Sequence, residues 1–324
     1  MTRSCFLSLV LAALSACGSK NTAASVDANG PETGPEPDAT CPAIHFMPTS
    51  VTPSIGLLLD RSGSMALNFG GVTRYQAMAS ALVDPNTGVV KQFEAKAYFG
   101  ATLYTTSGDT CPRLREVERS LNNYTAIANL INANSTPDPG GLTPTSSSIR
   151  AMVAAFAANP PPAGSPPLIV LATDGLPNGC GDSTQASVAA AAASYAAGIP
   201  LFVLAINETS EHFQDLANAG AGVQPGQPNA PYFIGNNPQD LVTAFNSIIG
   251  GAISCDLTIT GGTVDTAAGA LGTVVLNGQP LVYGVDWILV DGTTIQLTGA
   301  ACTELKSTPT PTVDASFPCG SVLL

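Results

Sequence analysis

The sequence carries little charge, and little of it is positive. Lys, Arg, Asp and Glu make up 10% of the 324 residues, against roughly 25% in an average soluble protein. The 11 Lys and Arg are outnumbered by 23 Asp and Glu, giving a formal net charge of −12 at pH 7. A chain this acidic is repelled by nucleic-acid phosphates and by anionic lipid headgroups, so we exclude generic binding to either.

Histidine is also scarce, and the common catalytic motifs are missing from the sequence. The two histidines, His45 and His212, form no His-x-x-x-His pair, which excludes the usual zinc-protease motif. The sequence has no Walker loop and no dinucleotide fingerprint. Gly181-Asp182-Ser183 resembles a hydrolase fragment, but no strand precedes it, so we interpret it as a loop and helix cap. The sequence therefore predicts a protein that is not an enzyme, and a hydrolase is the weakest hypothesis.

Long apolar runs are absent after the N-terminus. Residues 1–16 have one positive residue, Arg3, before an apolar run from about Cys5 to Leu14, as in a secretory signal peptide. The following Leu14-Ser15-Ala16-Cys17 resembles a bacterial lipobox, which implies cleavage before Cys17 and lipidation of that residue. The alternative is ordinary cleavage with Cys17 as a plain thiol. We expect an exported protein, lipid-anchored at the outer membrane of a Gram-negative bacterium, with the membrane face left open.

The remaining chain divides into three segments by composition. Residues 17–40 are rich in Pro and acidic residues and predict a linker without a core. Residues 41–254 alternate short apolar runs with helical patterns, and residues 255–324 hold Thr/Val/Ile-rich runs divided by Gly, which predict a small all-β appendix. The larger segment has predicted strands at 55–59, 97–104, 168–172, 200–206 and 232–234, and predicted helices at 74–83, 124–132, 146–158, 184–197 and 237–250.

Those predicted strands are continuously apolar, which indicates a sheet covered on both faces. Strands that alternate with helices favour an α/β fold with a doubly wound, mostly parallel sheet. In such a sheet, ligands bind beyond the carboxyl ends of the strands.

Three oxygen-rich loops are predicted at that edge of the sheet. They contain Asp60-Arg61-Ser62-Gly63-Ser64, Gly140-Gly141-Leu142-Thr143-Pro144-Thr145, and Thr173-Asp174-Gly175. Carboxylate and hydroxyl oxygens suit a hard divalent cation such as Mg²⁺ or Mn²⁺ rather than zinc or copper.

The order of these loops resembles a von Willebrand factor A domain with its metal-ion-dependent adhesion site. Asp60-x-Ser62-x-Ser64 matches the family's first motif, Thr143 its second-loop threonine and Asp174 its third-loop aspartate. The resemblance covers about residues 51–250. Leu142, which stands between the glycines and Thr143, departs from the pattern and leaves the choice between Thr143 and Thr145 open.

The resemblance implies how such a site works. Ser62 and Ser64 bind the metal directly, Thr143 directly or through water, and Asp60 and Asp174 mainly through waters and hydrogen bonds. An Asp or Glu of a protein ligand then completes the coordination. In some family members a shift of the last helix, here about 238–250, changes the affinity.

Six cysteines remain once Cys5 leaves with the signal peptide and Cys17 takes lipid. An even number in an oxidising compartment suggests three disulfides, with 15 possible connectivities. We predict Cys111–Cys180 at the rim of the metal site, Cys302–Cys319 within the β appendix, and Cys41–Cys255 joining the two ends of the α/β domain.

The sequence therefore supports two hypotheses about function. The first is a cell-envelope lipoprotein that binds a protein ligand through the metal, in adhesion or assembly. The alternative is a structural or assembly component in which the β appendix binds and the metal only stabilises the fold.

Overall fold

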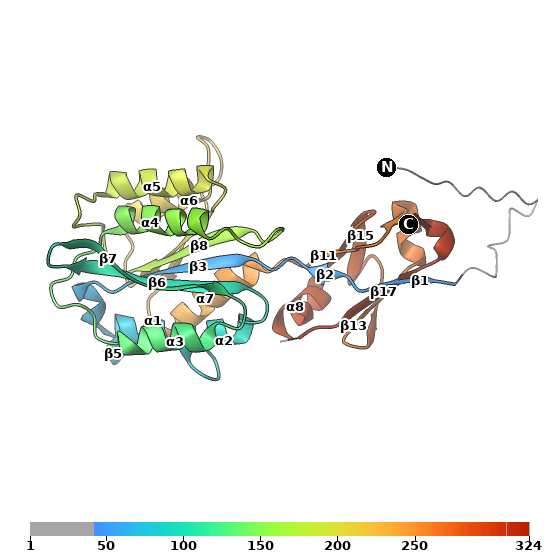
Figure 1. Cartoon of the computed structure of the whole chain (residues 1–324), viewed down its shortest axis with the longest axis horizontal. Coiled ribbons are helices and arrows are strands. Elements are labelled where there is room, and N and C mark those ends of the chain that lie inside the picture. Colours follow the sequence, from blue (N-terminus) through green and yellow to red (C-terminus); the bar gives the residue numbers. More distant parts are fainter. Residues whose placement is uncertain (1–41, 309, 324) are drawn as a thin grey trace, which may run out of the picture. The chain divides into compact units, whose positions relative to one another are not determined.

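A six-stranded sheet forms the centre of the α/β part of the computed structural model (Figure 1), which describes residues 42–308 and 310–323. All neighbouring strands are parallel except β6 and β7. The spatial order is β10 (Phe233–Gly235), β9 (Leu201–Ile206), β8 (Pro167–Thr173), β3 (Ser54–Asp60), β6 (Tyr98–Ser107) and β7 (Thr110–Ser120). The predictions about the signal peptide, Cys17 and the linker concern residues outside the described ranges.

Helices cover both faces of this sheet, as Figure 1 shows. One face carries α1 (Arg74–Val83), α2 (Val89–Phe93), α3 (Tyr124–Ala133) and α7 (Pro238–Ala252); the other carries α4 (Thr145–Ala158), α5 (Thr184–Ala196) and α6 (Glu211–Gly220). Because both faces are covered, β3 is buried along its whole length. This explains its unbroken apolar sequence. The predicted α/β fold class is confirmed.

Capping residues fix the starts of α1 and α7. Thr73 and Gln76 form a reciprocal capping box at the start of α1. The side chain of Asn237 accepts a hydrogen bond from Asp240 N at the start of α7, with Pro238 in the first turn. These are the residue types that satisfy the free backbone N–H groups of a first turn.

The edge strand β7 escaped sequence prediction because it does not look like a core strand. It reads Thr-Cys-Pro-Arg-Leu-Arg-Glu-Val-Glu-Arg-Ser and is mostly exposed or half-buried. An edge strand has one free side, so it tolerates charge, and charge there discourages pairing with other chains. The sequence analysis also did not predict α2, α6, η1 (Gly63–Ala66) or the β4 (Asn68–Phe69)–β5 (Val72–Thr73) hairpin.

The β part contains two four-stranded sheets. One has the order β1 (Ile44–Phe46), β17 (Val313–Phe317), β13 (Thr273–Leu276), β14 (Gln279–Leu281); the other has the order β15 (Trp287–Asp291), β16 (Thr294–Leu297), β11 (Asp256–Thr258), β2 (Thr49–Ser50). Smaller elements are β12 (Thr263–Val264), paired with β18 (Val322–Leu323), and the turns η2 (Thr266–Leu271) and η3 (Cys319–Ser321). Their shared core contains Trp287, which is fully buried and packs edge-on against Phe317.

The β part differs from the predicted appendix in three ways. Strands β1 and β2 lie before the α/β part in sequence, yet they pair with β17 and β11; the boundary at residue 41 had assigned them to the α/β domain. The segment is also not all β, because α8 (Gly299–Ser307) follows β16. Cys255, which directly precedes β11, forms a disulfide bond with Cys302 of α8.

That bond contradicts two predicted disulfides. Cys255–Cys302 excludes both Cys41–Cys255 and Cys302–Cys319. The two pairs were predicted from the positions of the cysteines in the sequence, which do not show how the chain folds back. Helix α8 brings Cys302 next to Cys255 at the start of β11, with a Cα–Cα distance of 5.5 Å. Cys319 is itself disulfide-bonded. The Cys111–Cys180 pair is present as predicted.

Within residues 42–308 and 310–323, no helix is both long and apolar enough to cross a bilayer.

Candidate metal centre

The first and third predicted loops meet because β3 and β8 are parallel neighbours. Their register pairs Leu59 with Ala172, so Asp60 and Thr173 leave the same edge of the sheet side by side. The Thr173 hydroxyl donates a hydrogen bond to Asp60 Oδ2 at 2.6 Å. Both side chains are buried. The Asp60 carboxylate is therefore held on the sheet rather than in solvent.

The residues of the first motif form a chain of hydrogen bonds that reaches Asp174. Ser62 N donates to Asp60 Oδ1 at 2.7 Å. The hydroxyl oxygens of Ser62 and Ser64 lie 3.0 Å apart. Ser64 Oγ then donates to Asp174 Oδ1 at 2.7 Å. Four of the five residues predicted to form the site are thus joined in one network.

Thr143 reaches the same edge through backbone contacts of the second loop. Gly63 N donates to Gly141 O at 2.9 Å, which links the first and second loops. Thr143 N donates to Asn178 Oδ1, and Asn178 N donates to Thr143 O, each at 2.9 Å. Thr143 is buried against the third loop. All three loops are therefore tied together.

The two carboxylates influence each other. Burial raises the pKa of Asp60 to about 7, and the neighbouring negative charge of Asp174 adds to this effect. The hydrogen bonds from Thr173 and Ser62 act in the opposite direction but do not cancel it. A buried carboxylate beside another one is a local excess of negative charge, which favours a bound cation.

One charged residue of the centre was missed by sequence reasoning. Arg74, the first residue of α1, places Nη1 2.8 Å from Asp174 Oδ2. The Arg74 side chain is 12% exposed and that of Asp174 is fully buried. No local motif marks this arginine, because its partner is 100 residues away.

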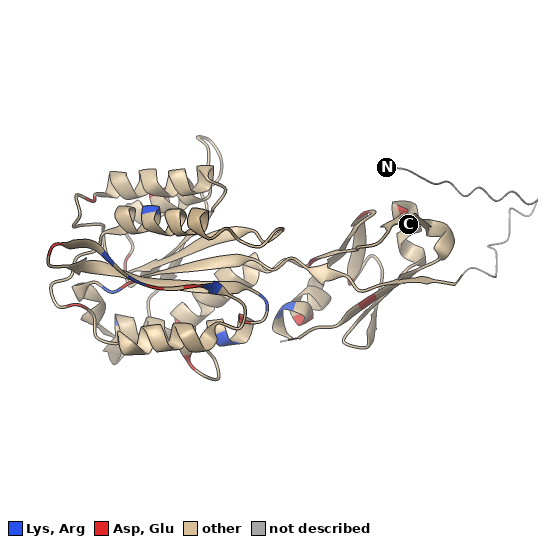
Figure 2. Cartoon of the chain, viewed as in Figure 1, with Lys and Arg blue, Asp and Glu red and all other residues tan. Residues whose placement is uncertain are grey.

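Further arginines lie beside the first loop. Arg61 stands between Asp60 and Ser62 in the first motif, and its Nη1 lies 2.8 Å from Asp138 Oδ2. Nη1 of Arg113, in β7, lies 3.4 Å from the same oxygen. Arg115 lines the same small crevice. One carboxylate thus pairs with two guanidinium groups. The chain as a whole is acidic, and Figure 2 shows how its charged residues are distributed over the described elements. This side of the centre carries a local positive excess.

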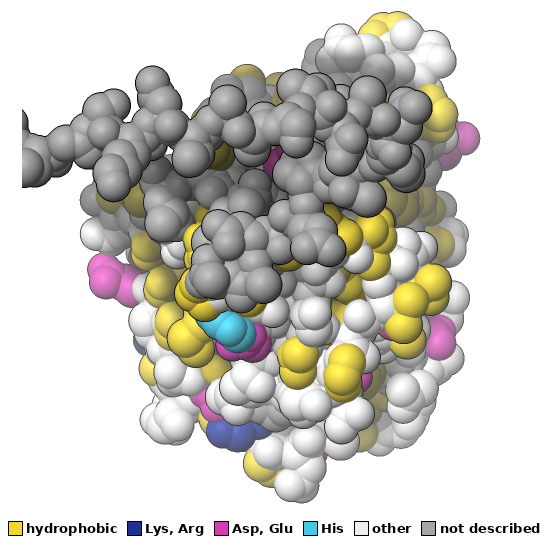
Figure 3. All heavy atoms as spheres, turned by 90° about the vertical axis from the view of Figure 1, so that its right-hand side faces the viewer, with side chains coloured by type: hydrophobic (Ala, Val, Ile, Leu, Met, Phe, Trp, Pro, Cys, Tyr) yellow, Lys and Arg dark blue, Asp and Glu magenta, His cyan; other side chains and the backbone are white. Residues whose placement is uncertain are grey.

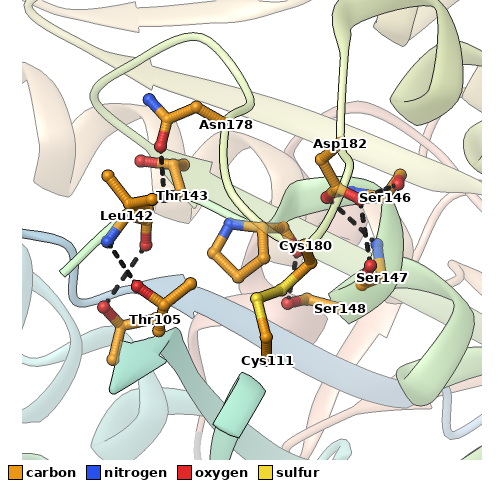
Figure 4. The surroundings of a disulfide bond; sticks show 12 residues. Thr105, Cys111, Leu142, Thr143, Ser146, Ser147, Ser148, Asn178, Cys180 and Asp182 are labelled. Atoms are coloured by element: carbon orange, nitrogen blue, oxygen red, sulfur yellow. Dashed lines mark hydrogen bonds between the residues drawn. A yellow bond between two sulfur atoms is a disulfide. The ribbon is translucent and has the colours of Figure 1, made fainter. Parts of the chain in front are cut away.

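The third loop is held to the rim by a disulfide and a carboxylate (Figure 4). Cys180 bonds to Cys111 at the start of β7, with a Cα–Cα distance of 5.4 Å. Two residues later, Asp182 accepts hydrogen bonds from the backbone N–H and hydroxyl groups of Ser146 and Ser147 in the first turn of α4. Both contacts fix the loop that begins at Asp174.

The donor set fits a hard divalent cation. Its oxygens come from two carboxylates and the hydroxyls of Ser62, Ser64 and Thr143, with no nitrogen or sulfur among them. Hard cations prefer such oxygen ligands. In the described parts of the chain, no group of three or more His, Cys, Asp or Glu side chains is placed to hold a metal ion, so the hydroxyl oxygens are needed to complete this donor set.

A family model now decides the classification. The model of the von Willebrand factor type A domain matches residues 54–242, more than half of the chain. The chain belongs to this family. No curated protein sequence matches it.

The solved structures with this fold are distant in sequence. The pilus adhesin SpaC from Lactobacillus rhamnosus GG matches with a TM-score of 0.53 and 16% identity, over 84% of this chain and 40% of that chain. This von Willebrand factor type A protein therefore spans about two fifths of the adhesin's length. At this identity the match shows a shared fold.

Two further matches, with lower TM-scores, have metal named in their descriptions. A manganese-loaded TRAP protein of Plasmodium vivax matches with a TM-score of 0.45 and 19% identity, over 64% of this chain and 78% of that one. A mussel byssus protein, proximal thread matrix protein 1, with a zinc-occupied metal-ion-dependent adhesion site, matches with a TM-score of 0.44 and 19% identity, over 69% and 52%.

Proposed function

We propose that this protein binds an acidic protein ligand through a divalent cation, Mg²⁺ or Mn²⁺, held by Asp60, Ser62, Ser64, Thr143 and Asp174. The observation that carries the proposal is the unbroken network from Asp60 through the two serine hydroxyls to Asp174. Such a network places neutral oxygens together and backs them with two carboxylates. We propose binding rather than an enzymatic role, because neither histidine of the chain is among these residues and the sequence carries none of the common catalytic motifs.

The five site residues have different roles in the proposed metal site. Ser62 and Ser64 supply neutral hydroxyl oxygens. Asp174 orients the Ser64 hydroxyl by accepting its hydrogen bond, and Asp60 holds the loop in place by accepting a hydrogen bond from Ser62 N. Thr143 fits the third hydroxyl better than Thr145, because the Thr145 hydroxyl already donates to Thr143 O. A divalent cation bound here supplies positive charge and an open coordination position for a carboxylate.

The surroundings support an acidic ligand. Arg61, Arg113 and Arg115 lie together beside the first loop. Among the described residues one carboxylate, Asp138, pairs with two of them, so a net positive charge remains to attract a second acidic group on the ligand. The exposed side chains of Leu142 and Leu176 flank the second and third loops and offer apolar contact next to the metal. Nucleic acid is not among the proposed partners, because the chain as a whole is strongly acidic.

The proposed location follows from the N-terminal sequence. A signal peptide over residues 1–16 and lipidation at Cys17 place the protein in the cell envelope, held to the membrane through acyl chains alone. Labelling cells with radioactive palmitate tests this: the wild type takes up label and Cys17→Ser does not. Label retained by the variant contradicts lipidation at Cys17.

Titration calorimetry with Mg²⁺ tests the metal site. The wild type should bind Mg²⁺, and Ser64→Ala, which removes the hydroxyl between Ser62 and Asp174, should weaken binding at least tenfold. Ser247→Ala is the matched control, because Ser247 is exposed on α7 and bonds only within that helix. Equal heats in the wild type and Ser64→Ala, or no heat in either, would refute the proposed site. A Mg²⁺-dependent pull-down eluted with chelator then identifies the ligand.

The second candidate assigns binding to the β part. Several of its large hydrophobic side chains are exposed, including Leu271, Val282, Val285 and Val290. Figure 3 shows hydrophobic side chains among the described residues on the face that it presents. Truncation before residue 255 is unsuitable as a test, because β1 and β2 would lose their partners. Instead, Val285→Asp should leave capture of the Mg²⁺-dependent ligand unchanged. Loss of capture in Val285→Asp but not in Ser64→Ala would favour the β part.

A further inference from the structure

We infer that Arg74 sets the charge of the metal centre, so that it weakens metal binding and strengthens binding of an acidic ligand to the metal-loaded protein. The inference rests on the proposed function. Arg74 lies outside the three loops that carry the motif, on the first turn of α1.

Among the described residues, Arg74 forms an ion pair with one carboxylate, that of Asp174. Its Nη1 lies 2.8 Å from Asp174 Oδ2 and 3.5 Å from Asp174 O. Its Nε is buried and has no hydrogen-bond partner among the described residues. An arginine usually satisfies several of its five donors when it is buried. Here both hydrogen bonds of the guanidinium group go to Asp174, one to its carboxylate and one to its backbone oxygen.

Arg74 and Ser64 divide the two oxygens of Asp174. Ser64 Oγ donates to Oδ1 at 2.7 Å, while Arg74 holds Oδ2. With both oxygens engaged, the Asp174 carboxylate is kept in its position as a hydrogen-bond acceptor. This arrangement favours an indirect role for Asp174 and leaves neutral hydroxyls as the nearest oxygens.

The charge count gives the consequence. With both carboxylates ionised, Asp60 and Asp174 carry two negative charges, and Arg74 neutralises one of them. A divalent cation then brings the centre to one net positive charge, which a ligand carboxylate neutralises. Without Arg74 the loaded centre is neutral, and the same carboxylate makes it negative. The nearby Arg61 does not change this count, because it is paired with Asp138.

The surroundings of the pair exclude strong screening. Asp174 is fully buried, and Arg74 is nearly so, so the charges interact in a medium where electrostatic effects are larger than in water. An exposed ion pair in the same place would have little effect on either binding step.

The test compares Arg74→Gln, Arg74→Lys and a control that loses the same charge elsewhere, Lys91→Gln, whose side chain is exposed on α2 and pairs with Glu94. Metal binding is measured by titration calorimetry with Mg²⁺. Carboxylate binding is measured with acetate as the probe, from the proton relaxation of water on the Mn²⁺-loaded protein. Unfolding in urea with chelator present monitors the fold of each variant.

We expect Arg74→Gln to bind Mg²⁺ about tenfold more tightly and acetate about tenfold more weakly than the wild type, a difference of about 1.4 kcal/mol each. Arg74→Lys keeps the charge and should stay within about threefold of the wild type for both probes. Lys91→Gln should not change either. The opposite signs of the two effects separate a charge role from simple damage to the fold, which would weaken both.

Three results would overturn the inference. They are weaker Mg²⁺ binding by Arg74→Gln, unchanged acetate binding by Arg74→Gln, and the same shifts in Lys91→Gln. Failure of the wild type and of Arg74→Gln alike to bind Mg²⁺ would instead refute the proposed metal site. Binding by Arg74→Gln but not by the wild type would support the inference, because it would show that the arginine opposes the metal.

Discussion

The two disulfides between described cysteines make a sharp test of what holds the metal centre together. Cys111–Cys180 closes a sequence separation of 69 residues, and Cys255–Cys302 closes one of 47. In the chain-entropy model, each restricts the unfolded chain by about 4 kcal/mol, and the logarithmic dependence makes the two values nearly equal. Measured losses are often smaller, so we expect each to cost about 2–4 kcal/mol when removed.

The two bonds differ in where they lie. Cys180 follows Asp174 by six residues, in the loop that Asp182 fixes to α4, whereas Cys255 and Cys302 belong to the β part. Removing Cys111–Cys180 therefore frees the loop that carries a metal-site carboxylate. Removing Cys255–Cys302 leaves that loop untouched.

The experiment uses two double variants, Cys111→Ser/Cys180→Ser and Cys255→Ser/Cys302→Ser, compared with the wild type at 25 °C. Urea denaturation should give similar losses of unfolding free energy for both variants. Calorimetry with Mg²⁺ on the folded proteins should give about three- to tenfold weaker binding for the first variant only. Equal Mg²⁺ affinity in both variants would refute the reasoning that the disulfide positions the site. So would a stability loss confined to one of them.

Three further predictions concern pH and packing. Because burial and the neighbouring Asp174 raise the pKa of Asp60 to about 7, and metal binding requires the ionised carboxylate, Mg²⁺ affinity should fall about tenfold for each pH unit below 7; calorimetry at pH 6 and pH 8 checks this, and an equal Kd at both contradicts it. Burial lowers the pKa of His212 below its ordinary 6.5, with Asp215 opposing the shift. The neutral form therefore stabilises the fold above about pH 6.5, and this stability is lost as pH falls through the folded pKa. Urea denaturation of His212→Gln should lack that part of the acid-side loss, while the variant of exposed His45, His45→Gln, should keep it. Trp287→Ala in the core of the β part should cost about 3–5 kcal/mol without changing Mg²⁺ affinity, and a changed affinity would show that the β part supports the site.

The sequence by itself determined the parts of the protein that depend on short-range pattern. Continuous apolar runs identified the parallel strands, because a strand covered on both faces has no polar side. Asn237 marked a helix start, because a cap acts over three or four residues. The three loops with Asp60, Thr143 and Asp174 were found because each follows or precedes such an element, and parallel strands bring their ends to one edge.

Only the tertiary structure decided which distant residues meet. Arg74 faces Asp174 across 100 residues, and nothing in the residues around either one encodes that contact. Strand β7 is charged because it lies at an edge, a position that appears only once the sheet is assembled. Strands β1 and β2 join the β part, and Cys255 meets Cys302, through pairings between segments far apart in the chain. The local pattern of polar and apolar residues predicts how a segment is buried. Which distant residues it contacts depends on the packing of the whole chain. The charge of the metal centre depends on one such contact, between Arg74 and Asp174.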